Sequence, residues 1–248
     1  MVTGLKTLWR NTRIRRLRPV VIGGCARSGT SLLLSMLSSH RQILAIPDET
    51  QLLCPGAYWP PAGGIFEPDT RGLLELISRQ TVHRNCRAWC EKTPRNVLNV
   101  ERILAALGSR ARFIHLVRDG RDVVLSRHPK KPEHFWVDPD RWVNDVRAGV
   151  NHRDHPQLTT IRYEDLIRSP QQVLGPLCEF LSLEYDDRLD NYPQHATVHE
   201  CEAWFEPARP LSDASIGRWM APGNSARVQQ LLDTPGAIEL LKEAGYDV

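Results

Sequence analysis

The hydrophobic positions of the chain alternate between short apolar runs and longer segments with the spacing of amphipathic helices. The apolar runs predict strands at Val20–Ile22, Ile43–Ile46, Arg87–Cys90, Ala111–Val117 and Leu158–Tyr163. The helical spacing predicts helices over Thr30–Leu37, 71–84, Val97–Leu107, Asp119–Arg127, Asp138–Arg153 and Gln171–Leu181. Strands that alternate with helices of this length form parallel sheets covered on both faces. We therefore expect an α/β fold of three layers, α/β/α, with a mostly parallel central sheet.

The segment between the first predicted strand and its helix is a candidate anion-binding loop. Its spacing, Gly24-x4-Gly29-Thr30-Ser31, is that of a P-loop, so the expected fold is P-loop-like. The backbone N–H groups of such a loop and the start of the following helix attract an anion without a metal ion. Thr30 stands where a nucleotide triphosphatase has its lysine, which favours a shorter anion than a triphosphate. Further side-chain donors are supplied by Arg27, Ser28, Thr30 and Ser31.

Two more polar segments come directly after predicted strands. They are Glu91–Arg95, after the third strand, and Arg118–Ser126, after the RFIHLV strand. In parallel sheets, ligands bind beyond the carboxyl ends of the strands. We therefore expect both segments and the Gly23–Ser31 loop to converge on one crevice.

Composition places the chain among ordinary globular proteins, and its charge is unevenly distributed. The 248 residues are 41% hydrophobic and 25% charged, and no repeat or linker divides them. Residues 1–18 hold six of the 32 basic residues and no acid, which leaves 26 basic against 29 acidic residues in the rest. We therefore expect a basic tail over 1–18 and a single domain over 19–248. The tail is either a solvated leader or a weak contact to an anionic membrane surface, and nothing in the sequence indicates nucleic-acid binding.

The cysteines and the apolar runs bear on the compartment. The six cysteines form no CxxC pair, and a chain of this size needs no disulfides, so reduced thiols and a cytoplasmic location are expected. Cys25 lies in the candidate loop before a helix, where the pKa of a thiol can be lowered. No run has the apolar core of a secretion signal or the length of a membrane span.

Two of these segments resemble motifs of the sulfotransferases that use 3′-phosphoadenosine 5′-phosphosulfate (PAPS). The Gly24–Ser31 loop is similar to the family's 5′-phosphosulfate loop, and Val117–Ser126 is similar to its 3′-phosphate motif. The resemblance implies that Arg118 and Ser126, eight positions apart, hold the 3′-phosphate. It also implies that the 5′-phosphosulfate is bound by the loop residues Gly24, Cys25, Ala26, Arg27, Ser28, Gly29, Thr30 and Ser31. Arg27 in this loop resembles the arginine of the bacterial and tyrosylprotein-type sulfotransferases, because cytosolic members usually have lysine at that position.

The resemblance extends into the second half of the chain with weaker motifs. Arg162–Leu166 is similar to a segment that many members carry, and Ser215–Trp219 to the segment that closes over the cofactor. It implies cofactor contacts for Tyr163, Gly217 and Arg218. A packed position in the core is the alternative for Tyr163 and Trp219.

The transfer of a sulfuryl group needs a base at the acceptor and a cation at the leaving oxygen. The resemblance assigns the base to Glu49, in Pro47-Asp48-Glu49-Thr50, with the neighbouring Asp48 as a competing choice. Capping of a helix, or pairing with an arginine, is the structural alternative for Glu49. Lys92 matches a lysine that the family places near the transferring group, and either Lys92 or Arg27 is expected to stabilise the leaving oxygen.

These residues predict a sulfotransferase that moves the sulfuryl group of PAPS in line to a hydroxyl or amine, without a metal ion. The alternatives are an ATP-dependent small-molecule kinase and a non-catalytic nucleotide-binding protein. His195 and His199 have a helical spacing, but no third metal ligand accompanies them. The acceptor, whether a small molecule, a carbohydrate or a peptide, is expected to contact the loops Gln51–Asp69 and Arg127–Asp138. The sequence does not indicate an oligomeric state.

Overall fold

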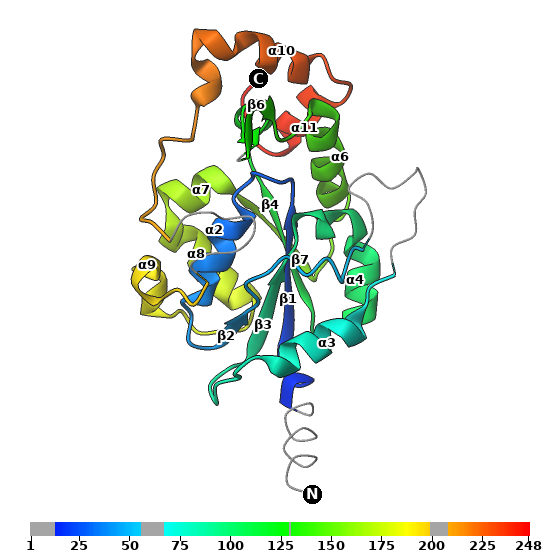
Figure 1. The fold of residues 1–248 in the computed structure, drawn as a ribbon, viewed down its shortest axis with the longest axis vertical. Coiled ribbons are helices and arrows are strands. Elements are labelled where there is room, and N and C mark those ends of the chain that lie inside the picture. The colour runs from blue at the N-terminus through cyan, green and yellow to red at the C-terminus, as the bar shows by residue number, and fades with distance from the viewer. Residues whose placement is uncertain (1–12, 56–66, 129, 199–207) are drawn as a thin grey trace, which may run out of the picture.

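The computed structural model describes residues 13–55, 67–128, 130–198 and 208–248. Its centre is a five-stranded sheet in the order β2-β3-β1-β4-β7, in which every neighbouring pair is parallel (Figure 1). The strands are β1 (Arg18–Gly24), β2 (Ile43–Ala45), β3 (Ala88–Lys92), β4 (Arg112–Val117) and β7 (Leu158–Arg162). The predicted α/β fold with a mostly parallel sheet is confirmed.

Helices cover both faces of this sheet because alternate strand residues point to opposite sides. Val20 and Ile22 of β1 face α2 (Thr30–Ser38), α7 (Tyr163–Arg168) and α8 (Pro170–Phe180). Val21 and Phe113 face the other layer, which contains α3 (Thr70–Arg79) and α4 (Val100–Leu107). Further along this second layer, Val117 packs in a cluster with α6 (Pro139–Val150), α10 (Ser225–Leu232) and α11 (Ala237–Glu243). Figure 1 shows α2, α8 and α9 (Tyr192–His195) on one side of the sheet and α3, α4 and α6 on the other.

The segment after β4 differs from the sequence prediction. A helix was expected over Asp119–Arg127, whereas α5 covers only Gly120–Val123 and an antiparallel hairpin follows, β5 (Arg127–His128) with β6 (Lys131–Phe135). Asp119 caps α5 by accepting from the backbone N–H of Arg121, and Arg227 donates to the carbonyl of Val124 at 3.3 Å. The helix therefore ends after one turn, and Ser126 lies beyond it rather than on it.

Three other predicted boundaries are also wrong. The helix expected over 71–84 ends at Arg79, because the following Gln80 adopts an extended conformation. The segment from Val97 begins inside a 3₁₀-helix, η1 (Pro94–Asn99), before α4 starts. The last predicted strand ends at Arg162, and Tyr163 is the first residue of α7.

The remaining short 3₁₀-helices lie in the second half of the chain. They are η2 (Asp187–Leu189), η3 (Arg218–Met220) and η4 (Pro222–Asn224). Some positions named in the sequence analysis lie outside the described residues: residues 1–12 of the basic tail, positions 56–66 of the first acceptor loop, His199 and Cys201.

Candidate active site

The loop after β1 has the backbone of an anion cradle. Gly29, with φ 96°, caps the start of α2, and Arg27 has a left-handed φ of 68°. A side chain at position 29 would be strained, and its Cβ would lie 2.5 Å from the ring of Tyr163. The loop therefore brings its backbone close to Tyr163, and it leads directly into the amino end of α2, as the spacing of Gly24, Gly29 and Thr30 predicted.

Side chains of the loop divide into two groups. Cys25 and Ala26 are buried in the cluster that contains α6, so they offer a ligand only their backbone. Burial raises the pKa of the Cys25 thiol, so the expected lowering is wrong. The hydroxyl of Ser28, in contrast, is buried and has no hydrogen-bond partner among the residues that the structure describes. A buried donor without a partner costs free energy, and a bound anion would satisfy it.

Arg118 connects the end of β4 to the loop and to the C-terminal part of the chain. It donates to the carbonyl of Arg27 at 3.1 Å and to that of Ser215 at 2.5 Å. Its guanidinium lies 4.3 Å from the ring centroid of Tyr163, whose hydroxyl is 2.9 Å from Oγ of Ser215. The two anion-binding segments predicted from the sequence are therefore neighbours, and Tyr163 lies against both.

Three arginines gather at this point. Desolvation, followed by the positive charges of Arg118 and Arg218, lowers the pKa of Arg27. The pKa of Arg218 is lowered by desolvation and by Arg118. Mutual repulsion among guanidinium groups marks a place where an anionic ligand is stabilised.

Asp122 holds the segment that carries Gly217 and Arg218. Its buried carboxylate accepts from the backbone N–H groups of Gly217 at 2.7 Å and Trp219 at 3.1 Å. Arg218 donates back to the Asp122 carbonyl at 3.1 Å. Burial raises the pKa of Asp122. Sequence reasoning missed this residue, because its partners are 95 or more positions away.

Lys92 joins the loop side of the site to Glu49. Its buried ammonium donates to Oε1 of Glu49 at 2.5 Å and to Oγ of Ser31 at 3.0 Å. The Glu49 side chain is 25% exposed, so the carboxylate stays accessible from the solvent while it contacts Lys92. Asp48 is exposed and does not share this contact.

A second carboxylate, missed from the sequence, anchors the Glu49 loop. Glu91 is fully buried and accepts from Oγ1 of Thr50 at 2.9 Å, from Oγ1 of Thr93 at 2.6 Å and from the amide of Asn96 at 2.7 Å. Burial raises the pKa of Glu91. Two adjacent charged residues, Glu91 and Lys92, in a strand whose other residues are apolar were the available signal.

The strand order places these residues in one row along the carboxyl edge of the sheet. Glu49 follows β2, Lys92 ends β3, the loop follows β1, Arg118 follows β4 and Tyr163 follows β7. Ser126, which follows α5, is also buried. A potential base, two cations and two buried residues with hydroxyl groups thus lie along one edge of the sheet, which suits the transfer of a group from an anionic donor.

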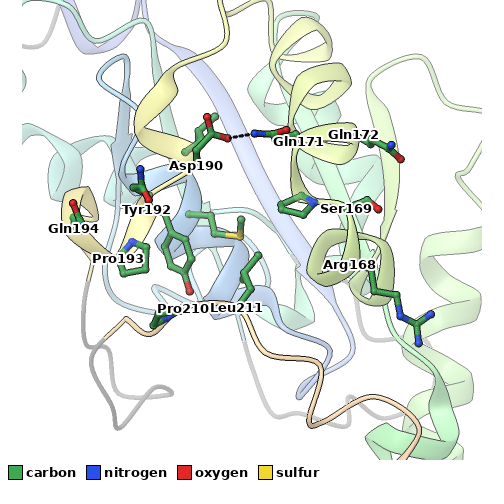
Figure 2. Close-up of a pocket in the computed structure, with 14 residues that line it drawn as sticks. Arg168, Ser169, Gln171, Gln172, Asp190, Tyr192, Pro193, Gln194, Pro210 and Leu211 are labelled. Carbon is green, nitrogen blue, oxygen red and sulfur yellow. Dashed lines mark hydrogen bonds between the residues drawn. The ribbon is translucent and has the colours of Figure 1, made fainter.

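A separate cavity of about 640 Å³ lies near the C-terminal end of α2, where Met36 lines it (Figure 2). Tyr192 and Leu211 point into it, and Gln171 pairs with Asp190 on its rim at 3.0 Å. None of the candidate site residues lines it.

Within the described ranges, no group of three or more His, Cys, Asp or Glu side chains is arranged to hold a metal ion. Over the same ranges, every helix is too short or too polar to span a bilayer.

Comparison with known proteins identifies relatives of the chain. A family model described as "Sulfotransferase family" matches residues 65–187, which include Lys92, Arg118, Ser126 and Tyr163. An uncharacterized protein of Aquifex aeolicus is 29% identical over 80% of this chain and 28% of its own length. Protein-tyrosine sulfotransferase 2 of Gallus gallus is 21% identical over 92% of this chain and 69% of its own length. The Drosophila melanogaster protein-tyrosine sulfotransferase is 23% identical, and the chain spans 52% of it.

Solved structures show the same fold at low identity. The sulfotransferase domain of the Synechococcus olefin synthase has a TM-score of 0.61 at 20% identity, over 94% of this chain and 97% of that one. The sulfotransferase domain of the curacin pathway has a TM-score of 0.59 at 19% identity, over 94% and 99%. A mouse sulfotransferase complexed with PAP has a TM-score of 0.55 at 13% identity, over 95% and 92%. The family model and the curated relatives therefore make the chain similar to sulfotransferases in sequence, and the solved structures make it similar to sulfotransferases in fold.

Proposed function

We propose that the chain transfers the sulfuryl group of PAPS to a hydroxyl or amine, with the donor bound along the carboxyl edge of the sheet. The observation that carries the proposal is the gathering of Arg27, Arg118 and Arg218 beside the P-loop-like turn. Three close guanidinium groups match a ligand with several anionic groups, as PAPS has at its 5′ and 3′ ends.

The loop is proposed to hold the 5′-phosphosulfate. Backbone N–H groups of Gly24, Cys25, Ala26 and Gly29 would donate to it, and the hydroxyls of Ser28, Thr30 and Ser31 would supplement them. The buried, unpartnered hydroxyl of Ser28 supports this assignment. No lysine occupies the position at which a P-loop contacts a triphosphate.

The second anion-binding group is proposed to hold the 3′-phosphate. Arg118, Ser126, Gly217 and Arg218 would contribute, and Tyr163 would lie beside the nucleoside between the two groups. The contacts of Arg118 with the Arg27 carbonyl and the Ser215 carbonyl support a shared site. Among the described residues, the buried Nε of Arg118 has no hydrogen-bond partner, which is consistent with a further acceptor at this site.

Glu49 is proposed to accept the proton of the acceptor as the acceptor atom attacks sulfur. The bond between sulfur and the bridging oxygen breaks in the same step, and that oxygen leaves with PAP. Lys92, hydrogen-bonded to both Glu49 and Ser31, lies where an ammonium could stabilise the charge on the leaving oxygen, with Arg27 on the other side of the loop. In this scheme no residue forms a covalent intermediate and no metal ion takes part.

The curated relatives named as protein-tyrosine sulfotransferases and the PAP-complexed mouse structure support a PAPS donor. No feature of the described residues selects a small molecule, carbohydrate or peptide as the acceptor.

Transfer from ³⁵S-labelled PAPS to a panel of phenols, sugars and tyrosine peptides, in the presence of EDTA, tests the proposal. We expect labelled product from the wild type and none above background from Glu49→Gln. Binding of PAP without transfer to any acceptor would favour the non-catalytic alternative. Transfer of γ-phosphate from ATP with Mg²⁺ would favour the kinase.

A further inference from the structure

The amino edge of the sheet, opposite the candidate site, carries a concentrated set of arginines. β1 begins at Arg18, β3 follows Arg87 and β4 begins at Arg112, and these three strands are neighbours. With the segments that precede them they form a group that we name the amino-edge arginine patch. It consists of Arg13, Arg15, Arg16, Arg18, Arg84, Arg87, Arg110 and Arg112.

The patch is one continuous surface because its segments bond to one another. Arg110 donates to the carbonyls of Arg15 and Arg16 at 2.8 Å each. Arg13 donates to the carbonyl of His83 at 2.5 Å, and the backbone N–H of Arg18 donates to the carbonyl of Arg87 at 2.8 Å. These contacts hold three segments, 13–18, 82–87 and 108–112, side by side.

The positive charge of the patch is not neutralised within the described chain. The segments 13–18, 82–87 and 108–112 contain no Asp or Glu. The arginines other than Arg13 form no ion pair with any residue that the structure describes. Arg110 and Arg112 donate to backbone carbonyls instead. Arg41, ahead of the neighbouring strand β2, contrasts with them because it pairs with Asp186 and Asp187.

Most of these charges face the solvent. Arg15, Arg16, Arg84, Arg87 and Arg110 are exposed, and the other three are partly exposed. Desolvation, followed by the charges of Arg112 and Arg110, lowers the pKa of Arg18. Exposed, unpaired charges of one sign attract an anionic partner and make that attraction dependent on salt.

We propose that the amino-edge arginine patch docks the protein on an anionic membrane surface. The sequence just before the patch favours a membrane over other polyanions: Leu5, Leu8 and Trp9 alternate there with Lys6 and Arg10. Apolar residues with a tryptophan among basic residues suit the boundary between lipid headgroups and acyl chains. The carboxyl edge is at the other end of the strands, so docking leaves the candidate active site facing the aqueous phase.

Sedimentation with lipid vesicles tests this proposal independently of sulfuryl transfer. We expect the full chain to bind vesicles of phosphatidylcholine with about one-third phosphatidylserine, and not vesicles of phosphatidylcholine alone. The double variant Arg84→Glu/Arg87→Glu should bind at least about twentyfold more weakly, since each basic residue near an anionic leaflet contributes about fivefold. Neither the Arg84 nor the Arg87 side chain makes a hydrogen bond that the structure shows, so this double variant should fold. Raised salt should release the wild type.

A matched variant separates the patch from net charge. Lys131→Glu/Lys242→Glu makes the same change of charge at exposed positions outside the patch and should bind vesicles like the wild type. PAP affinity, measured for all three proteins, should be equal and would show that each is folded. Equal vesicle binding by the two double variants would overturn the proposal, as would no binding by the wild type. Release of the wild type from vesicles by duplex DNA at equal phosphate concentration would assign the patch to nucleic acid instead.

Discussion

The ammonium of Lys92 lies 2.5 Å from Oε1 of Glu49, within the same hydrogen-bonded group as Oγ of Ser31. This contact connects the ends of β2 and β3 to the first turn of α2. A carboxylate that is to accept a proton and an ammonium that is to stabilise a leaving oxygen thus lie together beside the anion loop. The buried Glu91, through Thr50, fixes the segment that carries Glu49.

Replacement of the proposed base should stop turnover and leave donor binding intact. Glu49→Gln keeps the shape of the side chain but cannot accept a proton, so kcat should fall by about 10²- to 10⁴-fold. PAP affinity should change by less than about threefold, since Glu49 is not among the proposed donor contacts. Labelled transfer and calorimetry measure the two effects.

Asp48→Asn is the control for this prediction. Asp48 is exposed and has no contact with Lys92, so its replacement should leave kcat near that of the wild type. A loss of kcat in Asp48→Asn with normal activity in Glu49→Gln would transfer the role of base to Asp48.

Arg118 should discriminate between nucleotides with and without a 3′-phosphate. Arg118→Ala should weaken PAP binding by at least about tenfold, because charge-assisted hydrogen bonds to a phosphate are lost. Binding of adenosine 5′-phosphate, which lacks that group, should change much less. Because Arg118 also bonds two backbone carbonyls, Arg118→Lys and the circular dichroism of both variants control for misfolding. An equal loss for both nucleotides would contradict the assignment.

Asp122 should position the closing segment without contacting the reacting atoms. Asp122→Asn places an amide N–H group where the carboxylate accepts from Gly217 and Trp219. A mismatched buried donor costs about 1–3 kcal/mol, so PAP affinity should fall by roughly 5- to 150-fold if the segment shifts. Asp138→Asn makes the same change of charge at a side chain that is 76% exposed, and should have no effect on affinity. Lower stability with unchanged PAP affinity in Asp122→Asn would limit the residue to folding.

Local patterns in the sequence were sufficient for the sheet and the loop. The strand Val20–Ile22, the glycine spacing and the apolar helix are neighbours along the chain, so their physical consequence can be predicted from one window. Arg118 was also predictable, because a polar residue directly after a buried parallel strand lies at the carboxyl edge. The roles given to Glu49 and Lys92 came from family resemblance, and the sequence did not predict their contact.

The features that were missed depend on distant residues. The hairpin from Arg127 to Phe135 is rich in Lys and Pro, and such composition disfavours strands. It is stabilised by the guanidinium groups of Arg127 and Arg227, which lie 3.8 Å and 4.4 Å from the centroid of the Phe135 ring. The partner Arg227 is far along the chain, as are the partners of Asp122. No local window carries this information.

His115 should make the fold sensitive to acid. Its imidazole is fully buried against Gly149, and burial lowers its pKa from 6.5 to about 4. The unfolded chain therefore binds a proton below pH 6.5 that the folded chain excludes, so this stability is present above pH 6.5 and is lost as pH falls toward 4. Between pH 8 and pH 5 the free energy of unfolding should fall by about 2 kcal/mol through this group.

Urea unfolding of the wild type and of His115→Gln at both pH values measures this contribution. The variant should be less stable than the wild type at pH 8, and the difference in free energy of unfolding should shrink by about 2 kcal/mol at pH 5. A difference that stays constant with pH would show that His115 does not titrate as its burial implies.

Calorimetric titration of the wild type with PAP in EDTA, and with ATP in Mg²⁺, tests most directly whether the arginine-rich carboxyl edge is a PAPS site. PAP should bind without metal and at least about tenfold more tightly than Mg–ATP, a difference of about 1.4 kcal/mol or more. Tighter binding of Mg–ATP, or no binding of PAP, would contradict the account.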